Sequence, residues 1–391
     1  MPSASQHFAT ASLAELADGL RERRITAAQL AEDAIAAHER RDAALGAYRA
    51  FDAERARKQA AAADAAFAAG FDLGPLQGIP VSVKDLYGVS GWRTFAGTPR
   101  ELPAKWETEG PVVAEVRRNL AVITGKTHTV EFAFGGIGTN PHWGAPRNPW
   151  DDKAHRAPGG SSSGAGVSLW EGSALVALGT DTAGSVRIPA SMTGTVGVKT
   201  TVGRWSREGV VPLCRTLDTP GLLARSVADA ALAFAAVDPL VADPADRFLA
   251  ACGSLRVEDL RVGVCDWFFE GCDPGVAEGV QAAIGELAKA GLKVERFDWP
   301  ELLESAELFR TGGIAAAEFA AFIKGEMAPF RATLDPNVAA RFEKMEQIPA
   351  VEYLRRRWRL EELAADTEQR MAAVDFVLGP TVPITPPAIE S

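Results

Sequence analysis

Residues Ala157 to Gly203 read APGGSSSGAGVSLWEGSALVALGTDTAGSVRIPASMTGTVGVKTTVG. This stretch opens with a Gly/Ser loop, continues through the small apolar segment 174–178, and enters a second tight loop, 179–185, that carries another serine. Small residues allow a backbone to turn sharply and to approach another group closely, because they have no large substituent on Cβ. A flexible linker would explain the first loop alone, but a linker needs neither the apolar segment nor the second serine loop. We therefore interpret this stretch as the part around which the chain is organised.

Three motifs, taken in order along the chain, resemble the amidase signature family. They are Gly78–Asp85 (GIPVSVKD), the GGSS run at 159–162, and the segment 179–190 (GTDTAGSVRIPA). Any one of them alone is a weak signal, but the joint match in order and spacing is specific. The resemblance covers almost the whole chain, from the N-terminal helices to the segment DFVLGPTVPITPP at 375–387.

The resemblance implies an unusual catalytic triad of two serines and a lysine. It places the nucleophile at Ser185, the bridging serine at Ser161 and the base at Lys84, with a cis peptide bond between Gly160 and Ser161. It also implies an oxyanion hole made of backbone N–H groups in the second loop. The residues expected to form this hole are Thr182, Ala183, Gly184 and Ser185, and those expected to support the two loops are Gly160, Ser162, Asp181 and Arg187.

The chemistry of these residue types fits that assignment only if Lys84 is neutral. A serine hydroxyl is a poor nucleophile until a base takes its proton, and the usual base is histidine. None of the five histidines stands in a Ser-His-Asp pattern. A free lysine has a pKa of about 10.4, so burial among uncharged polar groups must lower it, and Asp85 must point away. Lys84 and Asp85 by themselves would suit a surface ion pair, and only the family resemblance favours the catalytic interpretation.

Composition and charge exclude several other classes of protein. The 391-residue chain has 47% hydrophobic and 24% charged residues, which is ordinary for a globular protein. Its formal net charge of −10 argues against nucleic acid or an anionic membrane as the main partner. The four cysteines form no CxxC pair and have no histidine at zinc-like spacing, so we expect neither a metal nor a cofactor. The N-terminus lacks a signal-peptide pattern, and we expect a cytoplasmic protein that spans no membrane.

The resemblance implies an α/β fold with a central mixed β-sheet flanked by helices on both faces, and the order of the segments agrees. We expect a single domain, 1–391, on which helices in residues 1–70 pack, with capping boxes that begin at Ser12 and Thr26. Further on, the sequence predicts strands at 80–83 and 121–125, an Ala-rich helix over 222–237, a strand–helix–strand unit over 260–297 whose helix Asp273 caps, two or three helices over 301–367, and a strand over 374–378.

The expected activity is hydrolysis of a small carboxamide, a non-peptide carbon–nitrogen bond in a linear amide, through an acyl-enzyme intermediate. Two alternatives stay open. The same family includes the glutaminase subunit of tRNA-dependent amidotransferases, from whose usual motifs this chain departs at Ile188, 200–202 and 206–209. A catalytically inactive scaffold would keep the fold without the chemistry, but all three triad positions are present.

The sequence does not specify which amide is the substrate. Candidate substrate contacts on the loops are Phe134, Gly135, Gly136, His142 and Trp143. Ala183 and Thr200 replace residues that are usual in the family, and the C-terminal part is shorter than in most members. A shorter C-terminal part predicts either a smaller sheet or a sheet edge that another chain completes, as in a homodimer.

Overall fold

The computed structural model describes residues 10–241, 245–311 and 313–389. Its strands are β1 (Tyr48–Phe51), β2 (Pro80–Lys84), β3 (Val122–Thr127), β4 (Val176–Asp181), β5 (Val196–Lys199), β6 (Thr219–Ala224), β7 (Arg261–Val264), β8 (Lys293–Arg296) and β9 (Phe376–Val377). Its α-helices are α2 (Leu13–Arg21), α3 (Ala27–Leu45), α4 (Ala53–Ala68), α5 (Pro111–Arg118), α6 (Ser163–Glu171), α7 (Arg187–Thr193), α8 (Val227–Val237), α9 (Ala245–Gly253), α10 (Val276–Lys289), α11 (Pro300–Arg310), α12 (Ile314–Glu326), α13 (Pro336–Glu343) and α14 (Ala350–Met371).

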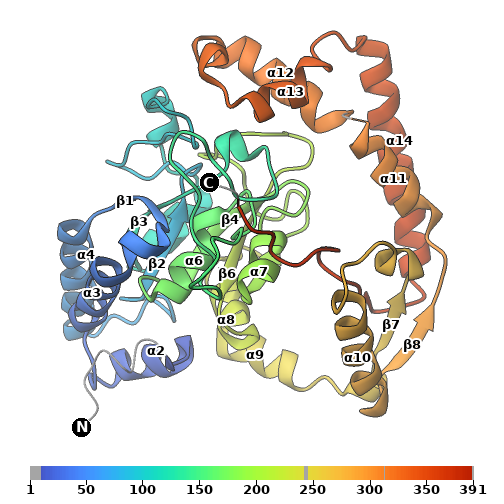
Figure 1. Ribbon diagram of the computed structural model, residues 1–391. Coiled ribbons are helices and arrows are strands. Elements are labelled where there is room, and N and C mark those ends of the chain that lie inside the picture. Colours follow the sequence, from blue (N-terminus) through green and yellow to red (C-terminus); the bar gives the residue numbers. More distant parts are fainter. Residues whose placement is uncertain (1–9, 242–244, 312, 390–391) are drawn as a thin grey trace.

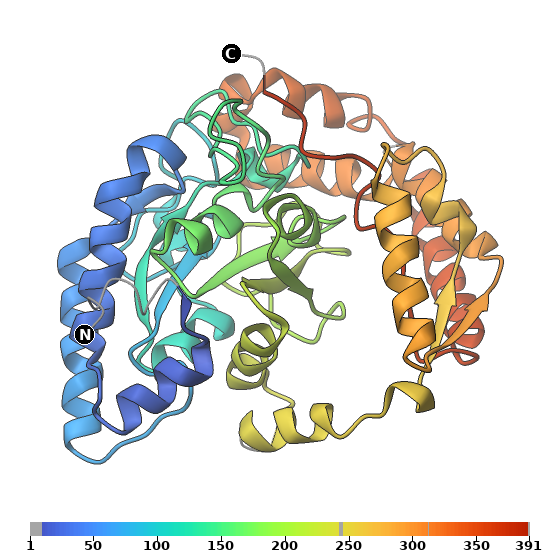
Figure 2. The same cartoon turned by 60° about the horizontal axis from the view of Figure 1, so that its bottom comes forward.

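A six-stranded mixed sheet forms the centre of the molecule (Figure 2). Its strand order is β1-β3-β2-β4-β6-β5, with β2 parallel to both β3 and β4 and the other pairs antiparallel. The four inner strands β3, β2, β4 and β6 are buried along their whole length, which suits their many apolar and small residues. The prediction of an α/β fold with a central mixed sheet is confirmed.

Helices cover both faces of this sheet, and the side chains of β4 show which helices lie on each face. Val176 and Leu178 belong to a large core that also contains residues of α5 and α8, whereas Ala177 between them belongs to a smaller core with residues of α6 and α7. Successive side chains of a strand point to opposite faces of the sheet. Therefore α5 and α8 lie on one face, and α6 and α7 lie on the other.

A smaller parallel sheet, in the order β8-β7-β9, lies apart from the central one (Figure 1). Beyond β9 the chain runs back to the central body, where Ala388 forms an isolated bridge with Arg156 and the N–H of Ala157 donates to the carbonyl of Pro387 at 2.8 Å. These contacts place residues 386–389 beside the entry to the Gly/Ser loop.

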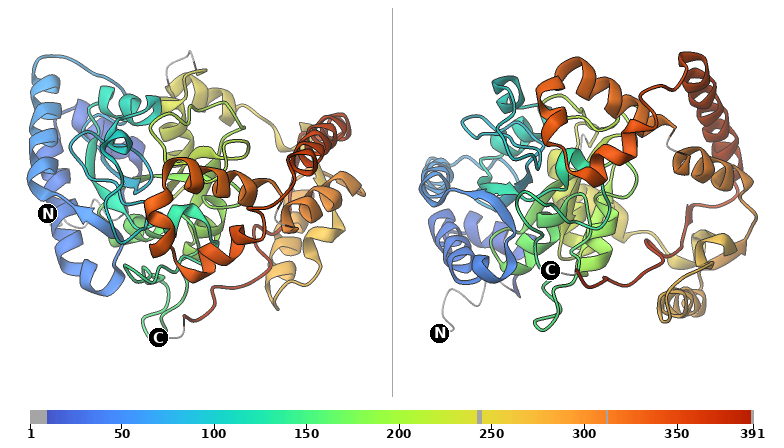
Figure 3. Two further views of the ribbon diagram at one scale, coloured as in Figure 1. Left: turned by 90° about the horizontal axis from the view of Figure 1, so that it is seen from above. Right: turned by 45° about the horizontal axis from the view of Figure 1, so that its top comes forward.

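Helices α12 and α13 cover loops of the central body (Figure 3). Phe319 of α12 and Phe342 of α13 are buried in one core with Phe132 and Leu213, which belong to two loops beside the central sheet. The ring centroids of Phe132 and Phe319 lie 5.5 Å apart. Segments that are distant in sequence therefore meet around the ends of the central strands.

The predicted N-terminal helices are confirmed within the described residues, and residues 1–9 lie outside them. Both capping boxes are present: Ser12 with Glu15, and Thr26 with Gln29. Three other predictions were wrong. The helix expected over 222–237 begins only at Val227, because residues 219–224 are a buried strand, β6, that pairs with β4 and β5. The helix that Asp273 was expected to cap begins later, at Val276. Residues 300–371 form four α-helices and not two or three.

Among the helices of the described residues, none combines the length and the apolar character that crossing a membrane requires. The expectation of a single domain stays a prediction.

Candidate active site

Side chains along β2 alternate between the two faces of the sheet, and Lys84 lies on the face that α6 covers. Ser82, two residues earlier, shares a hydrogen bond of 2.9 Å with Ser168 of α6, while Val81 and Val83 belong to the core on the opposite face. Lys84 is on the same side as Ser82, at the end of the strand. Its side chain therefore reaches the N-terminal end of α6, where Ser161 and Ser162 directly precede the helix.

Lys84 is fully buried, and its ammonium nitrogen contacts hydroxyl groups. Lys84 Nζ donates to Ser161 Oγ at 2.8 Å and to Thr180 Oγ1 at 2.8 Å. Burial lowers the pKa of Lys84 to about 7, although the charges of Asp181 and Asp218 partly oppose this. A substantial fraction of Lys84 is thus neutral near pH 7, which the proposed chemistry of a Ser-Ser-Lys triad requires.

The carboxylate of Asp85, the next residue, has its own cationic partner. Lys126 of β3 lies 3.1 Å from Asp85 Oδ1, and both side chains are buried. The Phe95 N–H also donates to Asp85 Oδ2, at 3.1 Å. Burial raises the pKa of Asp85 and lowers that of Lys126, while each charge favours the ionised form of the other. Asp85 therefore binds Lys126 and is not an ion-pair partner of Lys84.

Ser161 lies in a loop that touches backbone on several sides. The Gly160–Ser161 peptide bond is cis. The Gly160 N–H donates to the carbonyl of Gly136 at 2.7 Å, and the Val130 N–H donates to the carbonyl of Ser161 at 3.1 Å. A Cβ at Gly160 would lie 2.7 Å from the nitrogen of Gly138, so only glycine fits there.

The Ser185 loop is folded around the carboxylate of Asp181, the last residue of β4. Asp181 accepts hydrogen bonds from the N–H groups of Gly184 (2.7 Å), Val186 (3.1 Å) and Arg187 (3.3 Å). The Arg187 side chain adds bonds of 3.0 and 2.9 Å. Burial raises the pKa of Asp181, but these bonds and the Arg187 charge outweigh it and hold that pKa below its usual value. The geometry suits the predicted supporting roles of Asp181 and Arg187.

The two serine loops lie against each other. The N–H of Ser162 donates to the carbonyl of Ser185 at 3.2 Å, and Ser162 Oγ donates to the carbonyl of Thr180 at 3.3 Å. Within the described residues, no hydrogen bond joins the hydroxyls of Ser161 and Ser185. The structure thus brings Lys84, Ser161 and Ser185 into one neighbourhood, in which Lys84 Nζ is hydrogen-bonded to Ser161 Oγ.

One predicted oxyanion-hole residue needs correction. The N–H of Gly184 already donates to Asp181 and is not free to bind an oxyanion. In the described residues, the N–H groups of Thr182, Ala183 and Ser185 have no such acceptor. They are the donors that remain in the loop.

The five predicted substrate contacts fall into two groups. Phe134, Gly135 and Gly136 line a cavity of about 300 Å³ together with Arg341. Trp143 has other partners. Its Nε1–H donates to the carbonyl of Thr98 at 2.8 Å, and Cζ of the Arg49 guanidinium lies 3.6 Å from the centroid of its ring.

His142 also has a structural partner, since His142 Nε2 lies 3.1 Å from Glu131 Oε1. The Glu131 carboxylate is buried, and its second oxygen accepts the N–H of Asp335 at 2.7 Å. Neither His142 nor Trp143 lines the cavity beside Phe134 or the larger one beside Thr182. These two predicted substrate contacts are therefore better explained as structural residues.

A larger cavity, of about 350 Å³, is lined by Thr180, the residue whose hydroxyl contacts Lys84. Its walls include Thr180 and Thr182 from the central stretch, and Arg207, Arg215 and Asp218 from the loops that follow β5.

Three residues near the site were not predicted from the sequence: Thr180, Lys126 and Asp218. Thr180 stands inside GTDT, next to the predicted site residue Asp181, whereas Lys126 stands inside GKT, away from any predicted site residue. Nothing in their spacing shows which group each one contacts.

Comparisons with known proteins identify the family of the chain. The amidase family model matches residues 29–391. The chain belongs to the amidase signature family. A 2-amino-5-chloromuconic acid deaminase from Comamonas testosteroni is 52% identical over 379 residues, which are 97% of this chain and 81% of the relative.

More distant relatives belong to the same group of proteins. The glutamyl-tRNA(Gln) amidotransferase of Koribacter versatilis contains a chain that is 33% identical over 396 residues, covering 93% of this chain and 82% of the relative. A crystal structure of an amidase superposes with a TM-score of 0.86 at 30% identity, over 97% of this chain and 84% of that one. The chain is therefore a hydrolase that acts on carbon–nitrogen bonds other than peptide bonds.

The buried pair of Asp85 and Lys126 makes a testable prediction about stability. Replacing Lys126 with Met leaves the Asp85 carboxylate buried without its cation, and breaking a buried pair in this way costs about 3–5 kcal/mol. It also removes the donor to the carbonyl of Tyr87 and to Thr94 Oγ1. We expect urea unfolding to report a loss of this size, and the double variant Asp85→Asn/Lys126→Met to recover part of it.

The exposed pair Lys58–Glu54 supplies the control, because its side chains are 73% and 78% exposed. Lys58→Met should leave the unfolding midpoint nearly unchanged. Equal losses in Lys58→Met and Lys126→Met would contradict the assigned role of the buried pair.

Proposed function

We propose that the chain hydrolyses the amide bond of a small, carboxylate-bearing substrate through an acyl-enzyme on Ser185, with Ser161 and Lys84 as the proton relay. The observation that carries the proposal is the 2.8 Å hydrogen bond between Lys84 Nζ and Ser161 Oγ in a fully buried position. Burial lowers the pKa of Lys84, so that part of this lysine is a neutral amine near pH 7. A neutral amine can accept the proton that a serine must lose before it attacks.

The reaction would run in two halves. Neutral Lys84 accepts the proton of Ser161, Ser161 accepts that of Ser185, and Ser185 Oγ attacks the amide carbonyl carbon. The resulting oxyanion is met by the free N–H groups of Thr182, Ala183 and Ser185. The carbon–nitrogen bond then breaks, the relay returns the proton to the departing nitrogen, and water releases the acid from Ser185 by the same path. The hydrogen bond between Ser161 and Ser185 would form as the substrate aligns the Ser185 hydroxyl.

The substrate class is suggested by a relative and by one arginine. The 52% identical relative acts on 2-amino-5-chloromuconic acid, an amino-substituted carboxylic acid. In this chain Arg207 lines the cavity that Thr180 and Thr182 also line. In the described residues its guanidinium lies within ion-pair distance of no carboxylate, although burial raises the pKa of Asp218 on the same cavity and the charge of Arg207 partly opposes that rise. Arg215, on the same cavity, is instead paired with Glu326 at 2.7 Å. Arg207 is therefore a suitable cation for a substrate carboxylate.

The glutaminase subunit of a tRNA-dependent amidotransferase remains the second candidate, because relatives from glutamyl-tRNA(Gln) amidotransferases are 33–39% identical to this chain. The departures at Ile188, 200–202 and 206–209 and the higher identity to the deaminase favour the first candidate. A strong preference for glutamine over other amides would reverse this order.

The nucleophile is tested by replacing Ser185 with Ala. We expect amide hydrolysis to fall by at least about a thousand-fold with the circular dichroism spectrum unchanged, because no other group forms the acyl bond. A fluorophosphonate should label the wild type at Ser185 and leave the variant unlabelled. Ser163→Ala is the matched control, since Ser163 Oγ is buried with no hydrogen-bond partner in the described residues and should be dispensable. A wild type that neither hydrolyses amides nor labels would indicate an inactive scaffold.

The base is tested by the pH dependence of kcat. Lys84 is active when it is neutral, so kcat should rise with pH through about 7, the pKa that burial gives this lysine. Lys84→Arg should be inactive at every pH, because a guanidinium does not lose its proton. Turnover near the wild-type level in that variant would remove the lysine from the mechanism.

Two buried carboxyls titrate in the same range and need separate controls. Burial raises the pKa of Glu131 to about 7 and that of Asp218 to about 6. The negative charge of Asp218 raises the pKa of Lys84, so Asp218→Asn should move the rise in kcat to lower pH. Glu131→Gln should leave it in place. A rise in kcat that shifts in Glu131→Gln and not in Asp218→Asn would show that Glu131, and not Lys84, governs the pH profile.

The substrate class is tested with Arg207→Gln on two matched amides, one with a free carboxylate and one with its methyl ester. A charged hydrogen bond contributes about 1.5–3 kcal/mol, so kcat/KM for the acid should fall roughly ten- to a hundred-fold. The ester should lose much less. Arg215→Gln is the control, because this arginine already has a carboxylate partner. Equal losses on acid and ester would show that Arg207 does not recognise the carboxylate.

A further inference from the structure

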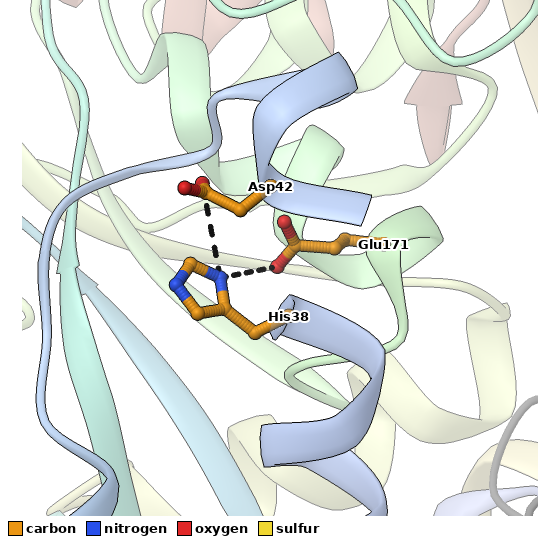
Figure 4. Close-up of side chains that lie close together, drawn as sticks. All are labelled: His38, Asp42 and Glu171. Carbon is orange, nitrogen blue, oxygen red and sulfur yellow. Dashed lines mark hydrogen bonds and ion pairs between the residues drawn. The ribbon is translucent and has the colours of Figure 1, made fainter. Parts of the chain in front are cut away.

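Three side chains gather where the end of α6 meets α3, away from the serine loops (Figure 4). His38 and Asp42 lie four residues apart on α3 and so share one face of that helix. Glu171 is the last residue of α6. One ligand atom from each of the three lies within 4.8 Å of the other two.

The Glu171 carboxylate is buried and only half satisfied. Its side chain has 0% exposure, and Glu171 Oε2 lies 3.3 Å from His38 Nδ1. Glu171 Oε1 has no hydrogen-bond partner among the described residues. Figure 4 shows the carboxylate pointing toward His38 and Asp42. A buried carboxylate oxygen without a donor is costly, and proteins normally provide a cation or a hydrogen bond for it.

The nearby protein cations and donors do not fill this role. Arg41 donates to the backbone carbonyls of Trp170 and Glu171 and not to the carboxylate. The Tyr48 hydroxyl bonds Thr124 and Ser173. The C-terminal end of α6 adds further negative potential from its carbonyl groups. This position therefore favours a cation beyond those that the protein supplies.

A proton on His38 would satisfy only part of the cluster. Asp42 Oδ1 lies 3.8 Å from the same Nδ1 that Glu171 approaches, and one N–H cannot point at both carboxylates. A tetrahedral Zn²⁺ with bonds of about 2.1 Å separates its ligand atoms by about 3.4 Å. The two distances from His38 Nδ1 are close to this value, and the two carboxylates lie within 4.8 Å of each other. The His38 ring is also held in place, since it stacks on Phe51 with centroids 3.9 Å apart.

We propose that His38 Nδ1, Asp42 and Glu171 bind a divalent transition-metal ion such as Zn²⁺. Imidazole together with carboxylates suits such ions better than Mg²⁺ or Ca²⁺, which favour sets of oxygen ligands. Asp42 is 44% exposed, so an ion can enter from solvent and keep a water molecule as a further ligand. The ion would tie α3 to the end of α6, the helix whose first turn follows Ser161 and Ser162. Its effect would be on the stability of the region that holds the serine loop.

The test is Zn²⁺ binding to the full chain after removal of metal with a chelator, followed by titration calorimetry and thermal unfolding. All proteins carry Cys252→Ser, because this exposed thiol would bind Zn²⁺ by itself. We expect one site per chain and a higher Tm with Zn²⁺ than with Mg²⁺. Glu171→Gln and His38→Gln should weaken Zn²⁺ binding by at least about ten-fold, since even changes outside the ligand set cost that much. His155→Gln, at an exposed histidine outside the cluster, is the matched control and should bind as the parent does.

Asp42→Asn keeps the test decisive if a buried variant fails to fold, because it removes a ligand from a half-exposed position. It should lose both the Zn²⁺ affinity and the rise in Tm. Absence of binding by the parent protein, or equal binding by the parent and Asp42→Asn, would overturn the proposal. A Tm that depends on pH and not on Zn²⁺ would likewise overturn it, by showing that a proton on His38 alone holds the cluster together.

Discussion

The site depends on the burial of one amine with hydroxyls around it. Lys84 is fully buried and contacts Ser161 and Thr180, and a charge in such a place is costly. The carboxylates that could hold it charged have other partners. Asp85 pairs with Lys126, and Asp181 binds Arg187 together with three backbone N–H groups. Burial lowers the pKa of Lys84 to about 7, because its effect is larger than that of the charges of Asp181 and Asp218, which still raise that pKa.

Close packing through glycine brings the parts of the site together. A Cβ at Gly164 would lie 2.0 Å from the carbonyl oxygen of Ala47, and one at Gly166 would lie 2.1 Å from Thr193 Oγ1. Helix α6 thus touches the loop after α3 on one side and α7 on the other with no room for side chains. This contact holds the Ser161 loop, at the start of α6, close to the end of β2 that carries Lys84. The abundance of small residues in the central stretch follows from this requirement.

Most of the wall of the larger cavity comes from segments outside the two serine loops, although Thr180 and Thr182 also line it. Arg207, Arg215 and Asp218 stand on the loops between β5 and β6, and α12 and α13 pack over them through Phe319 and Phe342. Residues 386–389 lie against residues 155–157, just before the Gly/Ser loop. The serine loops and most of the cavity beside them are thus built from different parts of the chain. In such an architecture the loops around a shared core can vary without changing the fold.

Local patterns in the sequence were enough to recognise the three motifs and, through them, the resemblance to the amidase signature family. That resemblance, and not the patterns themselves, implied the mixed sheet and the positions of Lys84, Ser161 and Ser185. Glycine and serine patterns and short apolar runs depend on near neighbours, so they can be read without the fold. Other features are visible only in the folded chain. Lys126 binds Asp85, and the carboxylate of Asp181 accepts the N–H of Gly184. Residues 219–224 form a strand, and Glu171 contacts His38, which is 133 positions away in the sequence. His142 and Trp143 look like substrate contacts in the sequence and have structural partners in the fold. Pairing partners and burial are set by contacts between segments distant along the chain, and no local pattern records them.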